Sequence, residues 1–292
     1  MVRVAVFGSS GLLGGELLRA LTEAHVEILA PVKNEVDVTH FDSVQRYFTS
    51  CEPTHVINAT ACTNVDELEK DPYLGWQVNA LGAGAVARAL QHKGKPVSLI
   101  HISTNYVFGD SKQQYIEDDT PAPLNTYGKT KAVGESLCSY YGKKPITCHI
   151  VRTSWLYSQG RETFADVVAK TLLQGGSVEA AEAYFGNPTY AADLARAITE
   201  NFILNKQLPG IFHVVNKTPK EGVSRYELAC SIAKILSVPS SHIKKVSRAR
   251  VFARRPRTAV LVNTKLPPLP LWTDSLQTYI TEKYGQKNTP SI

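Results

Sequence analysis

The sequence predicts an α/β fold, in which a doubly wound parallel sheet is followed by a smaller lobe. Three observations predict it. An apolar, β-branched run at residues 2–7 leads directly into Gly8, Gly11 and Gly14. Strand-like and helix-like runs then alternate to about residue 155. Tyr127 and Lys131 stand four residues apart, so a helix there would place both on one face.

The elements of the first half follow in a regular order. Strands are expected at 2–7, 26–30, 56–59, 97–103 and 147–152. Helices are expected at 12–21, 42–49, 73–92 and 126–141. This alternation is typical of a parallel sheet with right-handed crossovers and helices on both faces.

Beyond residue 155 the pattern loosens, and glycine and proline pairs separate shorter elements. We expect residues 1–155 to form the dinucleotide-binding domain and residues 156–285 to form mainly a substrate-binding lobe. A helix at 191–204 and a strand at 210–215 could return to the first domain, so that about 191–215 belongs to it. Residues 286–292 read as a frayed tail.

The glycine turn fits a dinucleotide site. A buried strand, a glycine-rich turn and a helix form the context of the Rossmann-type fingerprint. Gly8 would permit the tight turn, Gly11 the approach of backbone to a pyrophosphate, and Gly14 close packing of helix on strand. The helix N-terminus would supply donors to the phosphates. The alternative is a strand-to-helix connection that merely needs glycines.

Composition is that of an ordinary globular protein. The 292 residues are 43% hydrophobic and 20% charged, and no stretch is long and apolar enough to span a membrane. The N-terminal apolar run is too short for a signal peptide, so we expect a cytoplasmic protein. The five cysteines have irregular spacing, and the eight histidines show no ligand pattern. We therefore expect free thiols and no metal site.

The net charge of +6 suits a phosphate-bearing ligand as well as nucleic acid. A basic cluster comprises Lys244, Lys245, Arg248, Arg250, Arg254, Arg255 and Arg257. Only Phe252 interleaves it, so a nucleic-acid surface is the weaker interpretation. A solvated face, or the wall of a diphosphate pocket, fits the cluster better.

Tyr127 and Lys131 suggest the chemistry. An ammonium beside a phenol favours the phenolate, and we expect it to lower the tyrosine pKa from about 10. Such a tyrosine exchanges a proton with a carbonyl or alcohol oxygen while a nicotinamide exchanges hydride with the carbon.

The end of the second expected strand bears on the cofactor. NAD-selective sites place an acid there to hold the ribose hydroxyls, whereas this chain has Lys33 nearby and no acid. NADP(H) is therefore favoured, with NAD(H) left open. Lys33 could also be an ordinary surface lysine. Asp37 and Val38 follow and could reach the adenine edge.

A longer set of motifs completes the pattern. In chain order they are Gly8-x-x-Gly11-x-x-Gly14, residues 58–63 with Val65 and Asp66, residues 103–108, residues 121–131, Arg152 to Trp155, residues 185–189 and Arg255 with Pro256. Together they resemble the dTDP-4-dehydrorhamnose reductase family of the extended short-chain dehydrogenase/reductase superfamily. That family reduces the 4-keto group of a dTDP-linked 6-deoxy-4-ketohexose with NADPH or NADH, toward dTDP-L-rhamnose.

The resemblance implies roles for particular residues. Thr104 would hydrogen-bond the reacting oxygen, Tyr127 would donate the proton, and Lys131 would hold the nicotinamide ribose. The residues expected to line the cofactor are Gly8, Ser10, Gly11, Leu12, Leu13, Gly14, Lys33, Asp37, Val38, Ala59, Thr60, Ala61, Tyr127 and Lys131. The residues expected to meet the nucleotide sugar are Thr104, Asn105, Tyr106, Trp155 and Arg255. Some members of the family dimerise, so the resemblance makes a homodimer an expectation.

The chain departs from the family on the substrate side. Asn105 replaces an aspartate, Ala183 and Tyr184 replace Asp-Gln, and Glu162-Thr163 replaces Asn-Asn. An amide both donates and accepts, whereas a carboxylate only accepts. The sugar or its nucleotide could therefore differ from the family's usual substrate.

Two other functions fit the same motifs. One is a non-catalytic NADP-binding subunit resembling the β subunit of methionine adenosyltransferase, because fold does not fix function. The other is a nucleotide-sugar epimerase or a bifunctional epimerase/reductase. The Thr104, Tyr127 and Lys131 set favours a reductase over the non-catalytic subunit.

Overall fold

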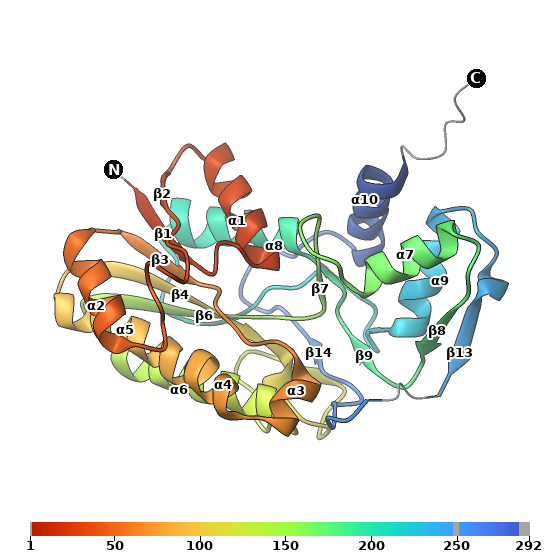
Figure 1. Ribbon diagram of the computed structural model, residues 1–292, viewed down its shortest axis with the longest axis horizontal. Coiled ribbons are helices and arrows are strands. Elements are labelled where there is room, and N and C mark those ends of the chain that lie inside the picture. Colours follow the sequence, from red (N-terminus) through yellow and green to blue (C-terminus); the bar gives the residue numbers. More distant parts are fainter. Residues whose placement is uncertain (1, 248–250, 286–292) are drawn as a thin grey trace.

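The computed structural model describes residues 2–247 and 251–285 (Figure 1). Its larger sheet confirms the doubly wound parallel architecture. The six strands, in spatial order, are β11 (Gly210–His213), β6 (Ile146–Thr153), β4 (Val97–Thr104), β3 (His55–Asn58), β1 (Arg3–Phe7) and β2 (Glu27–Leu29). Every neighbouring pair is parallel.

The strand order reverses beside β1. The chain passes from β1 outward to β2 and then crosses back to β3 on the other side. Ligands of open α/β sheets bind at the carboxyl ends of the strands where the order reverses. Phe7 of β1 pairs with Asn58 of β3, so Gly8 and Ala59 leave the sheet next to each other.

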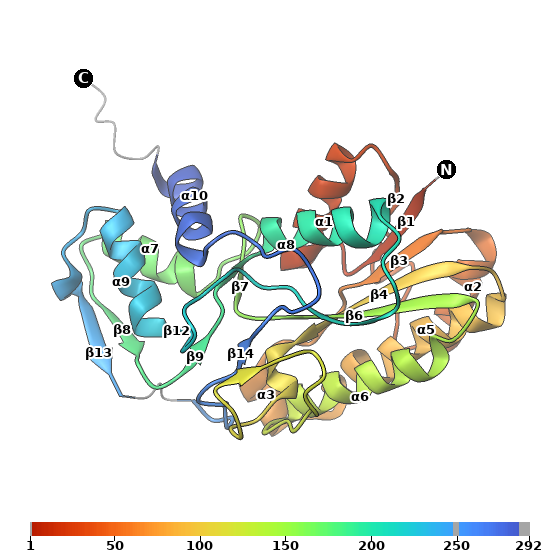
Figure 2. The ribbon, with the colours of Figure 1, turned by 180° about the vertical axis from the view of Figure 1, so that it is seen from behind.

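Helices cover both faces of the sheet (Figures 1 and 2). One face carries α1 (Leu12–Glu23) and α8 (Ala191–Ile198), which continues as the π-helical segment η3 (Thr199–Leu204). The other face carries α2 (Phe41–Ser50), α5 (Ala83–Lys93) and α6 (Thr126–Tyr141). Fully buried Leu17 and Leu194 fill the first layer, and Val86 and Leu90 the second. Burying each such side chain contributes roughly 1.5–3 kcal/mol.

The helix expected at 73–92 is observed as one continuous helical stretch over residues 73–93, with an irregular turn inside it. Short helices α3 (Val65–Lys70) and α4 (Tyr73–Gly75) precede a π-helical segment, η1 (Trp76–Gly82), which leads into α5. Fully buried Asn79 of η1 accepts from the Cys62 amide and donates to the Cys62 carbonyl and to Thr130 Oγ1. Its own carbonyl lies 2.2 Å from where a Cβ on Gly134 would be. The π segment therefore brings α6 against the loop after β3.

The smaller lobe has its own sheet and core. The parallel strands β8 (Val178–Ala181) and β13 (Ile243–Val246) pack with α7 (Phe164–Leu173), α9 (Arg225–Ile235) and α10 (Trp272–Tyr284). Three two-stranded pairs join β7 (Leu156–Tyr157) to β10 (Thr189–Tyr190), β9 (Phe185–Gly186) to β12 (Val223–Ser224), and β5 (Gln114–Tyr115) to β14 (Val260–Leu261). Short 3₁₀ turns are η2 (Asn105–Val107) and η4 (Ser240–His242).

Two later segments lie with the larger sheet. β11 pairs with β6, and α8 packs on α1. We therefore propose the division expected from the sequence, with 1–155 and about 191–215 in one unit and the rest of 156–285 in the lobe. The expected frayed tail, 286–292, lies outside the described residues. Within the described ranges, none of the helices combines the length and the apolar character that a membrane span requires.

Candidate active site

The glycine turn after β1 forms a cradle of exposed backbone. Gly8 has φ +81°, and a Cβ on it would lie 2.9 Å from the Ala59 carbonyl carbon. A Cβ on Gly14 would lie 2.1 Å from the Gly8 carbonyl oxygen. Gly11 begins α1 with no side chain to cap it, which leaves the first N–H groups of the helix for a ligand. Ser10 is exposed, Leu12 is partly exposed, and Leu13 is buried, so only the backbone of Leu13 could reach a ligand.

The loop after β3 forms the opposite wall. Fully buried Asn58 accepts hydrogen bonds from the Thr60 amide at 3.2 Å and from its hydroxyl at 2.6 Å. These bonds fix the segment from Ala59 to Ala61, in which Ala61 is exposed and the other two residues are partly buried. The wall is small and apolar, as a flat nicotinamide or adenine ring requires.

Lys33, Asp37 and Val38 occupy the segment between β2 and α2. Lys33 is exposed. Burial would raise the pKa of Asp37, but hydrogen bonds from Thr39 and the Lys33 ammonium hold it below its ordinary value. Val38 is 6% exposed and packs under Gly82, so it supports this segment from beneath.

The structure brings Thr104 and Tyr127 together. Thr104 ends β4, and Tyr127 lies in the first turn of α6. Asn125 caps that helix by accepting from the Gly128 amide at 2.8 Å. A Cβ on Gly128 would lie 2.0 Å from the Tyr106 carbonyl oxygen, so glycine is required where α6 meets η2. The Thr104 hydroxyl lies close enough to the Tyr127 phenol to lower its pKa.

The expectation that the pKa of Tyr127 lies below its usual value is wrong. Burial raises the pKa of Tyr127 to about 12, the Thr104 hydroxyl acts in the opposite direction, and Tyr106 adds to the rise. Desolvation of the phenolate outweighs the opposing effect of the Thr104 hydroxyl. Tyr127 is therefore protonated at neutral pH, which is the state a proton donor requires.

Lys131 lies one helical turn beyond Tyr127 and is 2% exposed. In the described part of the chain its Nζ donates to the Ile102 carbonyl at 2.6 Å and lies 3.4 Å from His101 Nε2. Burial lowers the pKa of Lys131 to about 8, against the opposing charges of Cys138 and Glu135. The ammonium is thus fixed against β4, below the tyrosine.

Asn105 is buried rather than solvated. It is 2% exposed, and its Nδ2 donates to the Ala259 carbonyl at 3.0 Å, while its Oδ1 lies 3.4 Å from Thr104 Oγ1. The amide therefore ties η2 to the segment before β14, a contact that the ionised carboxylate of an aspartate could not make.

Of the remaining predicted substrate residues, Tyr106 lies beside Tyr127. The Tyr106 and Tyr127 ring centroids are 5.9 Å apart. Arg255 binds both carboxylate oxygens of Asp66, at 3.2 and 3.1 Å. Trp155 has φ +43°, an uncommon conformation for a bulky residue, and its ring lies against Gly186, where a Cβ would come within 2.9 Å.

Sequence reasoning missed Arg225. Its guanidinium lies 3.9 Å from the centroid of the Trp155 ring and 4.8 Å from that of Phe164. An arginine outside any motif gives no signal by itself. The pairing of β12 with β9, which sets Ser224 opposite Phe185 directly before Arg225, could not be deduced from spacing.

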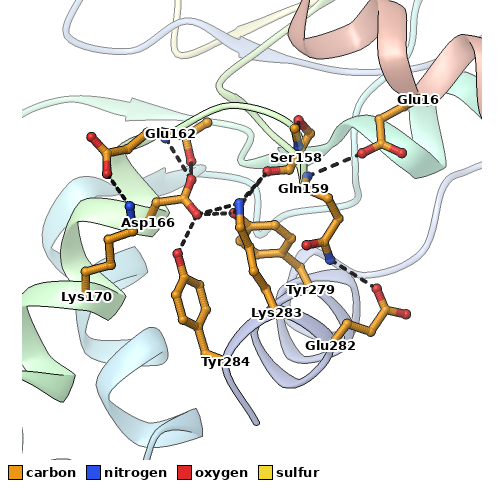
Figure 3. Close-up of polar contacts among 12 residues, drawn as sticks. Glu16, Ser158, Gln159, Glu162, Asp166, Lys170, Tyr279, Glu282, Lys283 and Tyr284 are labelled. Carbon is orange, nitrogen blue, oxygen red and sulfur yellow. Dashed lines mark hydrogen bonds and ion pairs between the residues drawn. The ribbon is translucent and has the colours of Figure 1, made fainter. Parts of the chain in front are cut away.

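Sequence reasoning also missed the loop between β7 and α7. Arg161 Nη2 donates to the carbonyl of Ser10 at 3.2 Å, so this loop lies against the glycine turn. Figure 3 shows how the loop is held: the Gln159 amide lies 3.3 Å from Glu16 of α1, and the Gln159 side chain reaches Glu282 of α10.

A buried carboxylate anchors the same loop. Asp166 is 1% exposed and accepts from the hydroxyls of Tyr279 and Tyr284, each at 2.6 Å, and from Lys283 at 2.8 Å (Figure 3). It also accepts from the Thr163 amide in a capping box. Burial would raise the pKa of Asp166, but these donors lower it to about 2.

Three of the five described cations of the basic cluster near residue 250 have an acidic partner. Lys245 pairs with Glu182 at 2.5 Å, and Arg254 approaches Asp110 at 3.8 Å. Arg248 and Arg250 lie outside the described residues. Paired cations make a weak nucleic-acid surface.

Comparisons with known proteins decide the family. The model of the RmlD substrate binding domain matches residues 2–284. The chain belongs to this family. A dTDP-4-dehydrorhamnose reductase from Bacillus anthracis, solved in complex with NADP, is 30% identical with a TM-score of 0.87, covering 97% of this chain and 100% of that one.

Two further relatives of this chain carry names of different kinds. The spore coat polysaccharide biosynthesis protein SpsK of Bacillus subtilis is 33% identical, covering 97% of this chain and 98% of its own. The methionine adenosyltransferase 2 subunit beta of Pongo abelii is 29% identical, covering 91% and 82%. The chain is thus similar both to a protein named as an enzyme and to one named as a subunit.

Proposed function

We propose that this protein is an NADPH-dependent reductase of the 4-keto group of a nucleotide-linked 6-deoxy-4-ketohexose, of the dTDP-4-dehydrorhamnose reductase type. The observation that carries the proposal is the protonated Tyr127 at the start of α6, beside Thr104 at the end of β4, with the buried Lys131 one turn away. The similarity to the Bacillus anthracis reductase supports both the substrate class and the cofactor.

The residues around the glycine turn fit a dinucleotide. The cradle has no room for a Cβ at Gly8 or Gly14, and the first N–H groups of α1 have no side-chain cap. These groups would bind the diphosphate. Lys33 would meet a 2′-phosphate, which favours NADP(H) over NAD(H). Ala59 and Thr60 would flank the ring system.

The chain's residues then perform the proton transfer. When bound, NADPH supplies a hydride to the carbonyl carbon. Thr104 and Tyr127 hold the carbonyl oxygen, and Tyr127 donates its proton as negative charge develops there. The Lys131 ammonium favours the phenolate that remains. Trp155 and Tyr106 form the wall that holds the sugar.

The identity of the sugar stays open to experiment. Ala183 and Tyr184 are partly buried, and Tyr184 lies near enough to affect the pKa of Tyr106. Substitution at these positions changes the pocket wall and leaves the proton donor in place. A sugar other than the family's usual one fits this arrangement.

A non-catalytic subunit is the second candidate. The similarity to methionine adenosyltransferase 2 subunit beta favours it, since that relative aligns over 91% of this chain. A non-catalytic protein would bind NADPH and show no turnover with any keto sugar, whereas the reductase proposal requires turnover. An epimerase would instead convert the sugar without net oxidation of NADPH.

Two further proposals concern the assembly and the compartment. We propose a homodimer, supported by the exposed aromatic side chains of Tyr73 and Trp76, which lie on adjoining segments α4 and η1. We also propose a cytoplasmic location, supported by the five free cysteines. Light scattering and fractionation test these two points.

The decisive assay follows the loss of NADPH absorbance with a panel of dTDP-, UDP- and GDP-linked 4-keto-6-deoxyhexoses. We expect turnover with at least one nucleotide series and a preference for NADPH over NADH. Failure of the whole panel, with NADPH binding intact, would reject the reductase in favour of the non-catalytic subunit.

A further inference from the structure

Arg225 occupies an unusual place beside the sugar wall. It is the first residue of α9, directly after β12, and its side chain is only partly exposed. Its guanidinium lies between the rings of Trp155 and Phe164, at 3.9 and 4.8 Å from their centroids. Stacking on aromatic faces orients the planar group and leaves its N–H edge free.

Within residues 2–247 and 251–285, no carboxylate lies within ion-pair distance of Arg225. The nearest acid in sequence, Glu227, is occupied, because it accepts from the Ser224 amide at 2.7 Å and from its hydroxyl at 2.8 Å. The residues outside the described ranges carry no Asp or Glu side chain. The chain therefore holds a stacked guanidinium for which it supplies no side-chain anion.

A second cation lies on the same side. The charge of Arg255 lowers the pKa of Arg225, and the charges of both guanidiniums lower the pKa of Tyr106. Burial first, and the charge of Arg255 second, lower the pKa of Arg225 to about 10, so it stays charged at neutral pH. Desolvating a cation beside another cation is unfavourable unless an anion joins them.

The position of Arg225 and Arg255 relative to Tyr127 suggests which anion they bind. The Tyr106 ring packs edge-to-face on Tyr127, and the charges of both guanidiniums lower the pKa of Tyr106. In a nucleotide sugar, the 4-keto group and the anomeric oxygen that carries the diphosphate lie at opposite ends of the ring. A sugar whose keto group meets Tyr127 would extend across Tyr106 and Trp155 toward Arg225.

We propose that Arg225, with Arg255 beside it, binds the diphosphate of the nucleotide-sugar substrate. The proposal rests on the proposed function for the identity of the ligand, and it adds the residue that anchors it. The two arginines differ in role: Arg255 is held by Asp66, whereas the stacked Arg225 offers its free N–H edge for a bidentate contact.

The test measures binding rather than turnover, so that its failure can be told from failure of the proposed function. Calorimetry would measure the affinity of the NADPH-loaded protein for dTDP, UDP and thymidine, and the affinity of the cofactor-free protein for NADPH. The variants are Arg225→Gln, which keeps a polar side chain without the charge, and Arg225→Lys, which keeps the charge without the planar guanidinium and its paired N–H donors. Arg88→Gln is the matched control, since Arg88 also stacks on an aromatic ring, 4.3 Å from the Phe41 centroid, on distant α5.

We expect Arg225→Gln to weaken binding of the preferred nucleoside diphosphate at least about tenfold, because a charge-assisted contact is lost. The affinities of Arg225→Gln for thymidine and NADPH should stay unchanged. The diphosphate affinity of Arg225→Lys should lie between those of Arg225→Gln and the wild type, and that of Arg88→Gln should equal the wild type's. Unchanged diphosphate affinity in Arg225→Gln, or an equal loss for thymidine, would overturn the proposal. A diphosphate-specific loss without turnover on any keto sugar would uphold the anion site and reject the reductase.

Discussion

Replacing Asn105 by aspartate should destabilise the fold in a way that depends on pH. The amide that donates to the Ala259 carbonyl at 3.0 Å would become a carboxylate facing that oxygen, at a position 2% exposed. A buried polar group left without its partner costs roughly 1–3 kcal/mol. An unfolding entropy of about 2.1 cal/mol/K per residue over 292 residues gives about 0.6 kcal/mol/K, so Tm should fall by about 2–5 °C.

The sign of the pH dependence follows from burial. Burial raises the pKa of the new carboxyl above its unfolded value of about 3.9, so the penalty is present above the folded pKa. As pH falls through that folded pKa, the protonated acid can donate to the Ala259 carbonyl, and the penalty is relieved. The deficit in Tm against the wild type should therefore shrink between about pH 8 and about pH 5.

Thermal unfolding of the wild type, Asn105→Asp and Asn34→Asp at several pH values tests this reasoning. Asn34 is exposed, so the same chemical change there should leave Tm within about 1 °C. We also expect the ratio of kcat/KM for two sugar nucleotides to be unchanged in Asn105→Asp. A Tm equal to the wild type's at pH 8, or a changed sugar preference, would show that Asn105 faces the ligand instead.

Three further predictions concern the cofactor, the proton transfer and the loop. Lys33→Ala should weaken NADPH binding by roughly 1.5–3 kcal/mol and leave NADH binding unchanged, since only NADPH carries the 2′-phosphate. Equal losses of affinity for the two cofactors, measured by titration, would exclude that role. Lys131 loses its charge as pH rises through about 8, so kcat/KM should fall above that pH, and a flat profile there would contradict the need for the ammonium. Asp166→Asn leaves Lys283 without its carboxylate, which should cost about 3–5 kcal/mol and lower Tm by about 5–8 °C, whereas Glu162→Gln, at the exposed pair with Lys170, should change Tm little.

The sequence was sufficient for the elements whose pattern is local. The strands β1, β4 and β6 are mostly buried and rich in apolar and β-branched residues, and their observed ends lie within one residue of those expected. Helix α6 begins and ends as expected, because Asn125 caps it and Gly142 follows it. Local side-chain pattern and capping decide such elements, whatever they pack against.

The features that depend on tertiary packing could not be predicted. The π-helical turn η1 exists because Asn79 bonds both to the loop after β3 and to α6. The role of Asn105 depends on Ala259, which is 154 residues away. Arg225 reaches the sugar wall only through the pairing of β12 with β9.

The direction expected for the Tyr127 pKa shift was wrong for a similar reason. The spacing of Tyr127 and Lys131 is visible in the sequence, but the degree to which the fold excludes water from the phenol is not. Because desolvation is the largest effect on the Tyr127 pKa, the phenol stays protonated.

The most direct test of the central claim is the kcat of Tyr127→Phe on the best 4-keto sugar nucleotide, with the NADPH affinity measured beside it. Removing the hydroxyl leaves the ring packed but deletes the proton donor, whose contribution is typically about 10²–10⁴. We predict that kcat falls at least about a hundredfold while NADPH affinity changes little. A variant that retains more than about a tenth of the wild-type kcat would show that Tyr127 is not the proton donor.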